Sequence, residues 1–82
     1  MQLRRRVVVL LSQMGQEAFR TVGIPEEGGE ATLFALETDE SGLWVSSRKA
    51  DGEHWVLIRW DCILAVDVPV GGTPSLEAAV QA

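Results

Sequence analysis

Cysteine and histidine are almost absent from this chain, and tyrosine is absent altogether. Cys62 and His54 are the single members of their residue types among 82 residues. One cysteine excludes a disulfide bond within the chain, so we expect a reducing, cytoplasmic environment. One histidine and one cysteine also fall short of the four ligands that a structural zinc site requires.

Recognised catalytic and cofactor-binding motifs are missing as well. His54, Asp61 and Cys62 are residue types that can form a nucleophile and its base, but their spacing matches no known motif. We interpret His54 as a surface strand residue and Cys62 as a packed thiol. The acidic residues lack the spacing of a calcium loop, and the glycine pairs lack the lysine of a phosphate-binding loop. We therefore expect no catalytic activity, no metal, no cofactor and no small-molecule substrate.

The chain has no long apolar run. The stretch from Val7 to Leu11 has five residues, whereas a secretory signal needs about 7 to 15 and a membrane-spanning helix needs about 20. We therefore expect no membrane contact and a cytoplasmic location.

Positive charge is scarce except near the amino terminus. The net charge is −5, but residues 1–20 carry four arginines and one glutamate, so the remainder of the chain is strongly acidic. An acidic body repels a phosphate backbone, because nucleic-acid affinity comes largely from cationic side chains. Only the cluster Arg4, Arg5 and Arg6 suggests contact with a nucleic acid or another anion, and net charge disfavours that partner.

The chain beyond residue 30 has the pattern of a β-sheet. Residues 31–38, 43–49, 53–60 and 63–68 are predicted strands, separated by short turns rich in aspartate and glycine. Residues 3–16 fit two interpretations: apolar residues recur at helical spacing, whereas three consecutive valines favour a strand. Of these, the helix is the interpretation that we adopt.

The predicted fold is α+β and mainly β. We expect a small antiparallel sheet or a partly open barrel of four to five strands, with an N-terminal helix. Residues 1–70 should form a single small domain, and residues 71–82 a flexible C-terminal tail that includes a short helical turn.

The dipeptide Asp51-Gly52 predicts a type I′ hairpin turn, because these residues tolerate the positive φ angles that this turn requires. With this turn, Val45 would face Ile58 and Leu43 would face Trp60 on an apolar side of the hairpin. Trp60 would then belong to the core.

The opposite side of the hairpin would pair Trp44 with Arg59 and Arg48 with Trp55. Tryptophan and arginine are enriched in protein interfaces, so these four residues are the candidate interface. Pairing of Thr38 with Leu43 would extend both faces onto the preceding strand. That register places Phe34 and Leu36 on the apolar side, and Ala31, Leu33 and Ala35 on the tryptophan side.

The segment from Ile58 to Val68 resembles the end of the small β-barrels of the Sm-like and SH3-like type. In those barrels a tight turn joins the last two strands, and residues 60–63 could form it. The resemblance covers about residues 30–68. Residues 39–43 replace the uridine-binding loop of Sm-like proteins without its asparagine, so the resemblance implies no RNA-binding residue here.

Two functional hypotheses follow from these patterns. The first is a non-catalytic structural or protein-interaction module that binds itself or another protein through an aromatic sheet face or a strand edge. The second is a small nucleic-acid-binding β-barrel that uses the N-terminal arginines.

Overall fold

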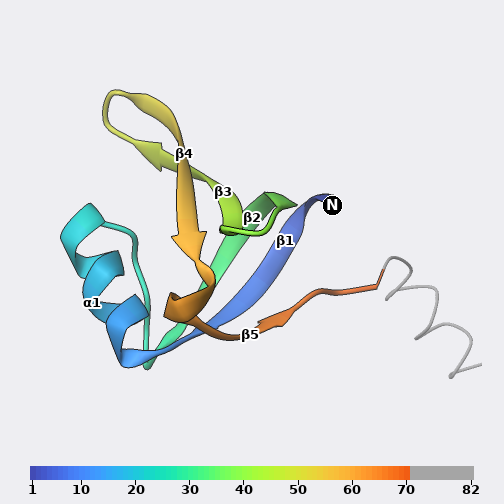
Figure 1. The fold of residues 1–82 in the computed structure, drawn as a ribbon. Coiled ribbons are helices and arrows are strands. Elements are labelled where there is room, and N and C mark those ends of the chain that lie inside the picture. Colours follow the sequence, from blue (N-terminus) through green and yellow to red (C-terminus); the bar gives the residue numbers. More distant parts are fainter. Residues whose placement is uncertain (71–82) are drawn as a thin grey trace, which may run out of the picture.

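The computed structural model describes residues 1–70, so the predicted tail, residues 71–82, lies outside the described part. Its strands form one antiparallel sheet in the order β4-β3-β2-β1-β5, which is not closed because β4 and β5 remain as its two ends (Figure 1). The predicted α+β, mainly β class is confirmed. The elements are β1 (Gln2–Leu11), α1 (Gln13–Val22), β2 (Glu30–Thr38), β3 (Gly42–Lys49), β4 (Gly52–Arg59), the 3₁₀ helix η1 (Trp60–Cys62) and β5 (Ile63–Asp67).

The N-terminal segment is a strand, so the helical interpretation of residues 3–16 is wrong for most of its length. Val7, Val9 and Leu11 are buried while the residues between them are more exposed, which is the two-residue period of a strand. Valine side chains are restricted in a helix and pack well on a sheet. The expected helix forms one segment later, as α1.

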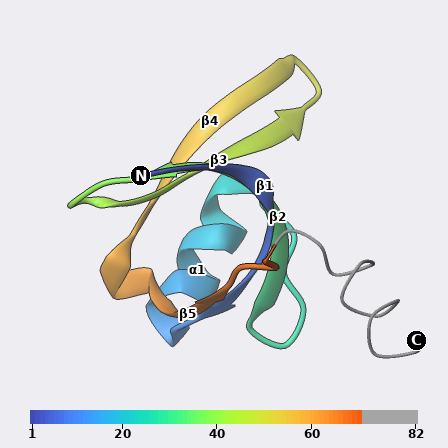
Figure 2. The same cartoon turned by 90° about the vertical axis from the view of Figure 1, so that its right-hand side faces the viewer.

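Local caps define the bounds of α1. The Ser12 hydroxyl accepts a hydrogen bond from the backbone N–H of Gly15 at 3.1 Å, which satisfies one of the free donors at the helix start. Gly23 ends the helix with a φ of 80°, a conformation that glycine adopts without strain. Figure 2 shows α1 lying within the curve of the sheet.

The hairpin of β3 and β4 pairs two residues away from the predicted register. Leu43 pairs with Ile58, and Lys49 pairs with Gly52, so Ala50 and Asp51 form the turn. The predicted type I′ turn required positive φ at both Asp51 and Gly52. Only Gly52 has it, at 126°, so the predicted turn type is wrong. A shift of two residues keeps every side chain on its predicted face.

A bulge in β2 reverses the predicted faces of its first half. Thr38 pairs with Leu43 as expected, but the register slips between Ala35 and Glu37 and leaves Leu36 as the extra residue. A slip of one residue exchanges the two faces of a strand. As a result Ala31, Leu33 and Ala35 are buried in the core and Phe34 is 40% exposed on the opposite face, contrary to the prediction.

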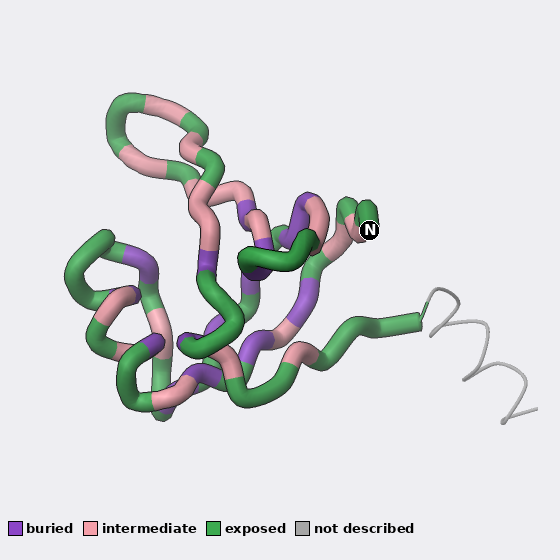
Figure 3. Tube along the Cα trace, in the orientation of Figure 1, coloured by how far each residue is buried: buried purple, intermediate pink, exposed green. Residues whose placement is uncertain are grey.

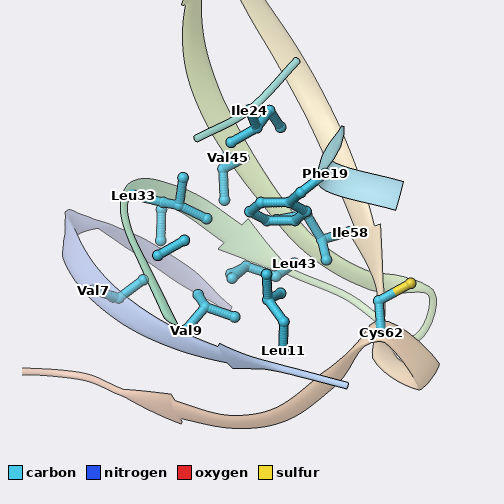
Figure 4. Packing of buried hydrophobic residues seen from close by; sticks show 12 residues of the cluster. Val7, Val9, Leu11, Phe19, Ile24, Leu33, Leu43, Val45, Ile58 and Cys62 are labelled. Carbon is cyan, nitrogen blue, oxygen red and sulfur yellow. The ribbon is translucent and has the colours of Figure 1, made fainter. Parts of the chain in front are cut away.

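The core lies between α1 and the concave face of the sheet. Phe19 of α1 and Ile24 of the following loop point toward the hairpin residues Val45 and Ile58, with Leu43 beside them (Figure 4). The predicted core position of Trp60 is wrong, because this residue lies in η1 and is 39% exposed. The remaining buried members are Val7, Val9, Leu11, Ala31, Leu33, Ala35 and Cys62.

Candidate interaction surface

The outer half of the β3–β4 hairpin projects from the core. None of residues 46–57 is buried, and Figure 3 colours the tip of the hairpin only as intermediate and exposed. We call residues 46–57 the hairpin arm. Near its base the arm contacts the rest of the molecule through Ser46, which pairs with Phe34 of β2, and through Val56, which packs against the core. Nearer its tip, Lys49 Nζ donates to the carbonyl oxygen of Val22 at 2.9 Å.

The face of the sheet turned away from the core, here the outer face, carries two exposed aromatic residues in one row across the strands. The register places Arg6, Phe34, Ser46 and Trp55 side by side on four adjacent strands. Phe34 is 40% exposed and Trp55 is 60% exposed. Burying two such rings on a partner would remove a large apolar area from water.

The four residues of the predicted interface lie on this outer face, but their predicted pairs do not form. Trp44 pairs with Leu57 and Arg48 with Glu53, while Trp55 lies opposite Ser46 and Arg59 opposite Gly42. The two-residue shift of the hairpin register separates each arginine from its expected tryptophan. No stacked pair of guanidinium and indole is therefore supported at these positions.

The three tryptophans differ in their hydrogen bonds. The indole Nε1 of Trp44 donates to Asp39 Oδ2, and that of Trp60 donates to the Asp39 carbonyl oxygen, each at 3.0 Å. The Trp55 indole donates to no residue that the structure describes. Trp55 is thus the tryptophan whose position leaves it available to a partner. The sequence feature that pointed to Trp55 was its place in a predicted strand close to the Asp51-Gly52 turn.

Within residues 1–70, strand β4 is an edge of the sheet that pairs with no strand on the side away from β3. It pairs with β3 over all eight residues without a bulge, and its central residues, His54 to Ile58, include no lysine, glutamate or proline. Natural edge strands are usually short, bulged or charged, because their free backbone groups can pair with another chain. The other edge, β5, has five residues and a register shift against β1.

A small apolar hollow of about 160 Å³ lies between α1 and β4. Ala18 and Val22 line it on the helix side, and the consecutive residues Val56, Leu57 and Ile58 line it on the strand side. Consecutive strand residues point to opposite faces, so the hollow borders the strand itself rather than one face. The edge of β4 is therefore flanked by apolar surface.

The three N-terminal arginines do not form one patch. The Arg5 guanidinium donates to the carbonyl oxygen of Pro69, while Arg6 lies on the outer face opposite Phe34. Neighbouring strand residues point to opposite faces, so Arg5 and Arg6 diverge. Arg4 has a φ of 50° at the register shift of β1.

The titratable residues are dispersed over the fold. His54 Nε2 lies 2.7 Å from Asp51 Oδ1, and this hydrogen bond lowers the pKa of Asp51. Burial raises the pKa of the Cys62 thiol above its usual range, and the adjacent Asp61 carboxylate acts in the same direction. The structure does not bring His54 and Cys62 together. Within residues 1–70, no three side chains of histidine, cysteine, aspartate or glutamate are grouped to hold a metal ion.

Comparison with known protein families, curated proteins and solved structures gives no match for this chain. No helix in the described part is long and apolar enough to cross a membrane.

Proposed function

We propose that this chain is a non-catalytic protein-interaction module that self-associates through the edge of β4 and the adjacent outer face. The observation that carries the proposal is the β4 edge itself. It is an eight-residue strand that ends the sheet, pairs without interruption on one side and has an uncharged centre. Such an edge offers a row of backbone donors and acceptors to an incoming strand.

The exposed tryptophan supports this location of the contact. Trp55 is the central aromatic residue of β4, is 60% exposed, and projects from the hairpin arm rather than from the core. Backbone pairing alone gives little selectivity, whereas large aromatic side chains at an interface centre supply much of the affinity. A strand that pairs with β4 would lie directly beside this ring.

The charge of the outer face favours nucleic-acid binding less than it favours self-association. Arg6, Arg48 and Arg59 lie on the outer face, but Glu37 and Glu53 share that face with them. A phosphate chain would meet both signs of charge there. A complex with RNA or DNA that weakens with salt, and that is lost when arginines 4–6 are replaced by alanine, would support this alternative instead.

The resemblance to small Sm-like or SH3-like barrels remains a proposal. Its support is the short turn η1 between the last two strands of the chain, β4 and β5, which form the two opposite edges of the sheet. We also propose the cytoplasm as the location, on the support of a single free cysteine.

Molar mass in solution tests the proposed function. We expect wild-type protein to associate on concentration, and Trp55→Lys to remain monomeric with an unchanged circular dichroism spectrum. The matched control is Leu10→Lys, because Leu10 is 40% exposed and lies in β1, away from the β4 edge. The control should associate like the wild type. A protein that stays monomeric at concentrations up to about 1 mM would contradict the proposal, because a dissociation constant above that value corresponds to a binding free energy of only about 4 kcal/mol.

A further inference from the structure

The outer-face residues of β4 follow an order that is complementary to itself when reversed. From the turn toward η1 these residues are Glu53, Trp55, Leu57 and Arg59. An acidic residue begins the series, a basic residue ends it, and two large apolar residues lie between them. Val56 is at the midpoint. A strand with this order can face an antiparallel copy of itself with favourable contacts at each position.

We propose that the partner at the β4 edge is a second copy of this chain, paired antiparallel with β4 about a two-fold axis at Val56. This register places Glu53 opposite Arg59 of the second copy, and Trp55 opposite Leu57 of the second copy. Symmetry repeats each pair, so the interface contains two ion pairs and two apolar pairs. The two five-stranded sheets join into one continuous sheet.

Other registers lose this complementarity. Centring the axis on Trp55 places Glu53 opposite Leu57, and centring it on Leu57 places Glu53 opposite Asp61, a like charge. A register displaced by one residue pairs outer-face side chains with inner-face side chains of the second copy. Opposite charges directly across a strand pair stabilise it and like charges destabilise it. The axis at Val56 is the register that satisfies both charges and both apolar residues.

The charged residues at the two ends of the pairing are accessible. Arg59 is 74% exposed in its side chain, and its guanidinium lies 3.7 Å from the Asp61 carboxylate, itself half exposed. Glu53 is exposed and accepts a hydrogen bond from the Ser46 hydroxyl. Neither group is held in a buried ion pair within the chain, so both can reach the second copy.

Charge argues against the other free edge as the partner. The sequence of β5 contains one charged residue, Asp67. If β4 paired with β5 of another copy, Glu53 would therefore find no cation in that strand. The register shift at β5 would also interrupt a continuous ladder. A closed two-fold dimer follows from β4 pairing, whereas β4 to β5 pairing would add copies end to end.

The inner side of the same pairing covers the apolar hollow next to α1. Val56 and Ile58 line that hollow, and Val56 of the second copy would lie directly opposite Val56. The pairing therefore removes apolar surface on both faces of the edge from water.

This inference rests on the proposed function. Reversing the charges of the paired residues tests the proposed register between the two β4 strands. We expect the full chain to be a dimer by light scattering, and Glu53→Arg or Arg59→Glu to weaken it by about tenfold or more, because each creates two like-charge pairs. The double variant Glu53→Arg/Arg59→Glu should restore wild-type affinity. The matched controls are Glu17→Arg, Arg20→Glu and their combination, which make the same charge changes at exposed positions of α1 and should leave the dimer unchanged.

The possible outcomes separate the two proposals. If Trp55→Lys abolishes a dimer but the double charge variant fails to restore it, the register is wrong and self-association stands. An assembly larger than a dimer overturns the two-fold pairing, and a monomer overturns both proposals. As an independent measurement, Val56→Cys should form an intermolecular disulfide on mild oxidation, since residues opposite across a strand pair have suitable spacing. Ser47→Cys in β3 should not.

Discussion

The indole of Trp44 donates a hydrogen bond to the carboxylate of Asp39 at 3.0 Å, across the turn that joins β2 and β3. The other carboxylate oxygen accepts from the backbone N–H groups of Ser41 and Gly42, at 2.8 Å and 3.1 Å. The Asp39 carbonyl oxygen accepts from Trp60. One short turn therefore orients two of the three tryptophans, Trp44 and Trp60.

Asp39 should make the stability of this turn depend on pH. The hydrogen bond from Trp44, followed by that from Ser41, lowers the pKa of Asp39 below its ordinary value of 3.8. The folded state therefore binds this proton less tightly than the unfolded state does. The resulting stability is present above pH 3.8 and is lost as the pH falls through the lower folded pKa.

The corresponding experiment compares Asp39→Ala with the wild type by thermal unfolding. At pH 7 the variant should unfold at a lower temperature, and the difference should shrink as the pH falls below 3.8. Glu40→Gln serves as the control, because Glu40 is an exposed carboxylate in the same turn. A difference that is independent of pH would show that the charge of Asp39 contributes nothing.

Gly15 should be intolerant of a side chain. A Cβ atom at this position would lie 2.2 Å from the backbone carbonyl oxygen of Cys62, so α1 and η1 would have to separate. We expect Gly15→Ala to reduce the free energy of unfolding by about 1–3 kcal/mol, the usual range for overpacking. Urea unfolding measures it, with Gln13→Ala, an exposed position in the same helical turn, as the control. Equal stability of the two variants would refute the close packing.

Phe19 and Trp55 should respond oppositely to truncation. Phe19 is 2% exposed and lies at the centre of the core, so Phe19→Ala should cost about 3–5 kcal/mol and leave little folded protein. Trp55→Ala should leave the unfolding temperature of the dilute protein nearly unchanged. Circular dichroism melts at low protein concentration provide the comparison. Strong destabilisation by Trp55→Ala would place that ring in the fold rather than at an interface.

Cys62 should react slowly with thiol reagents in the native state. Its side chain is buried, and burial raises the pKa of the thiol, so little reactive thiolate is accessible at neutral pH. Alkylation by iodoacetamide at pH 7.0 should be about 100-fold or more faster in urea-unfolded protein than in native protein. The reason is that native Cys62 reacts only in the small fraction of molecules in which local unfolding exposes it. The control is a small free thiol under the same conditions, and a native rate equal to the unfolded rate would contradict the packing.

The strands beyond residue 30 could be predicted because their signals are local. Alternating apolar residues between glycine and aspartate turns located β2 to β5, although the predicted strand 53–60 included Trp60, which lies in η1. The inward faces of Leu43, Val45 and Ile58 were also correct. These features survived the two-residue error in the hairpin register, because a strand repeats every two residues.

The errors at β1 and β2 arise where the local sequence does not determine the backbone. Residues 3–16 fit both a helix and a strand, whereas the strand at residues 31–38 was expected to be regular and instead bulges at Leu36. In each case the choice depends on residues distant in sequence. Val7 and Val9 pair with β2 on one side, and Val9 also pairs with β5 on the other. Without the contacts of those strands, no pattern within the segment decides between the alternatives.

The sequence by itself determined the class of the fold, the location of four strands and the face of each residue in β3 and β4, since these depend on short-range periodicity. Only the tertiary structure decided that β1 joins the sheet, that a bulge exchanges the faces of β2, and that β4 is left as a free edge. Those features arise because strands far apart in the sequence pair with one another, and no short segment contains both partners of such a pair.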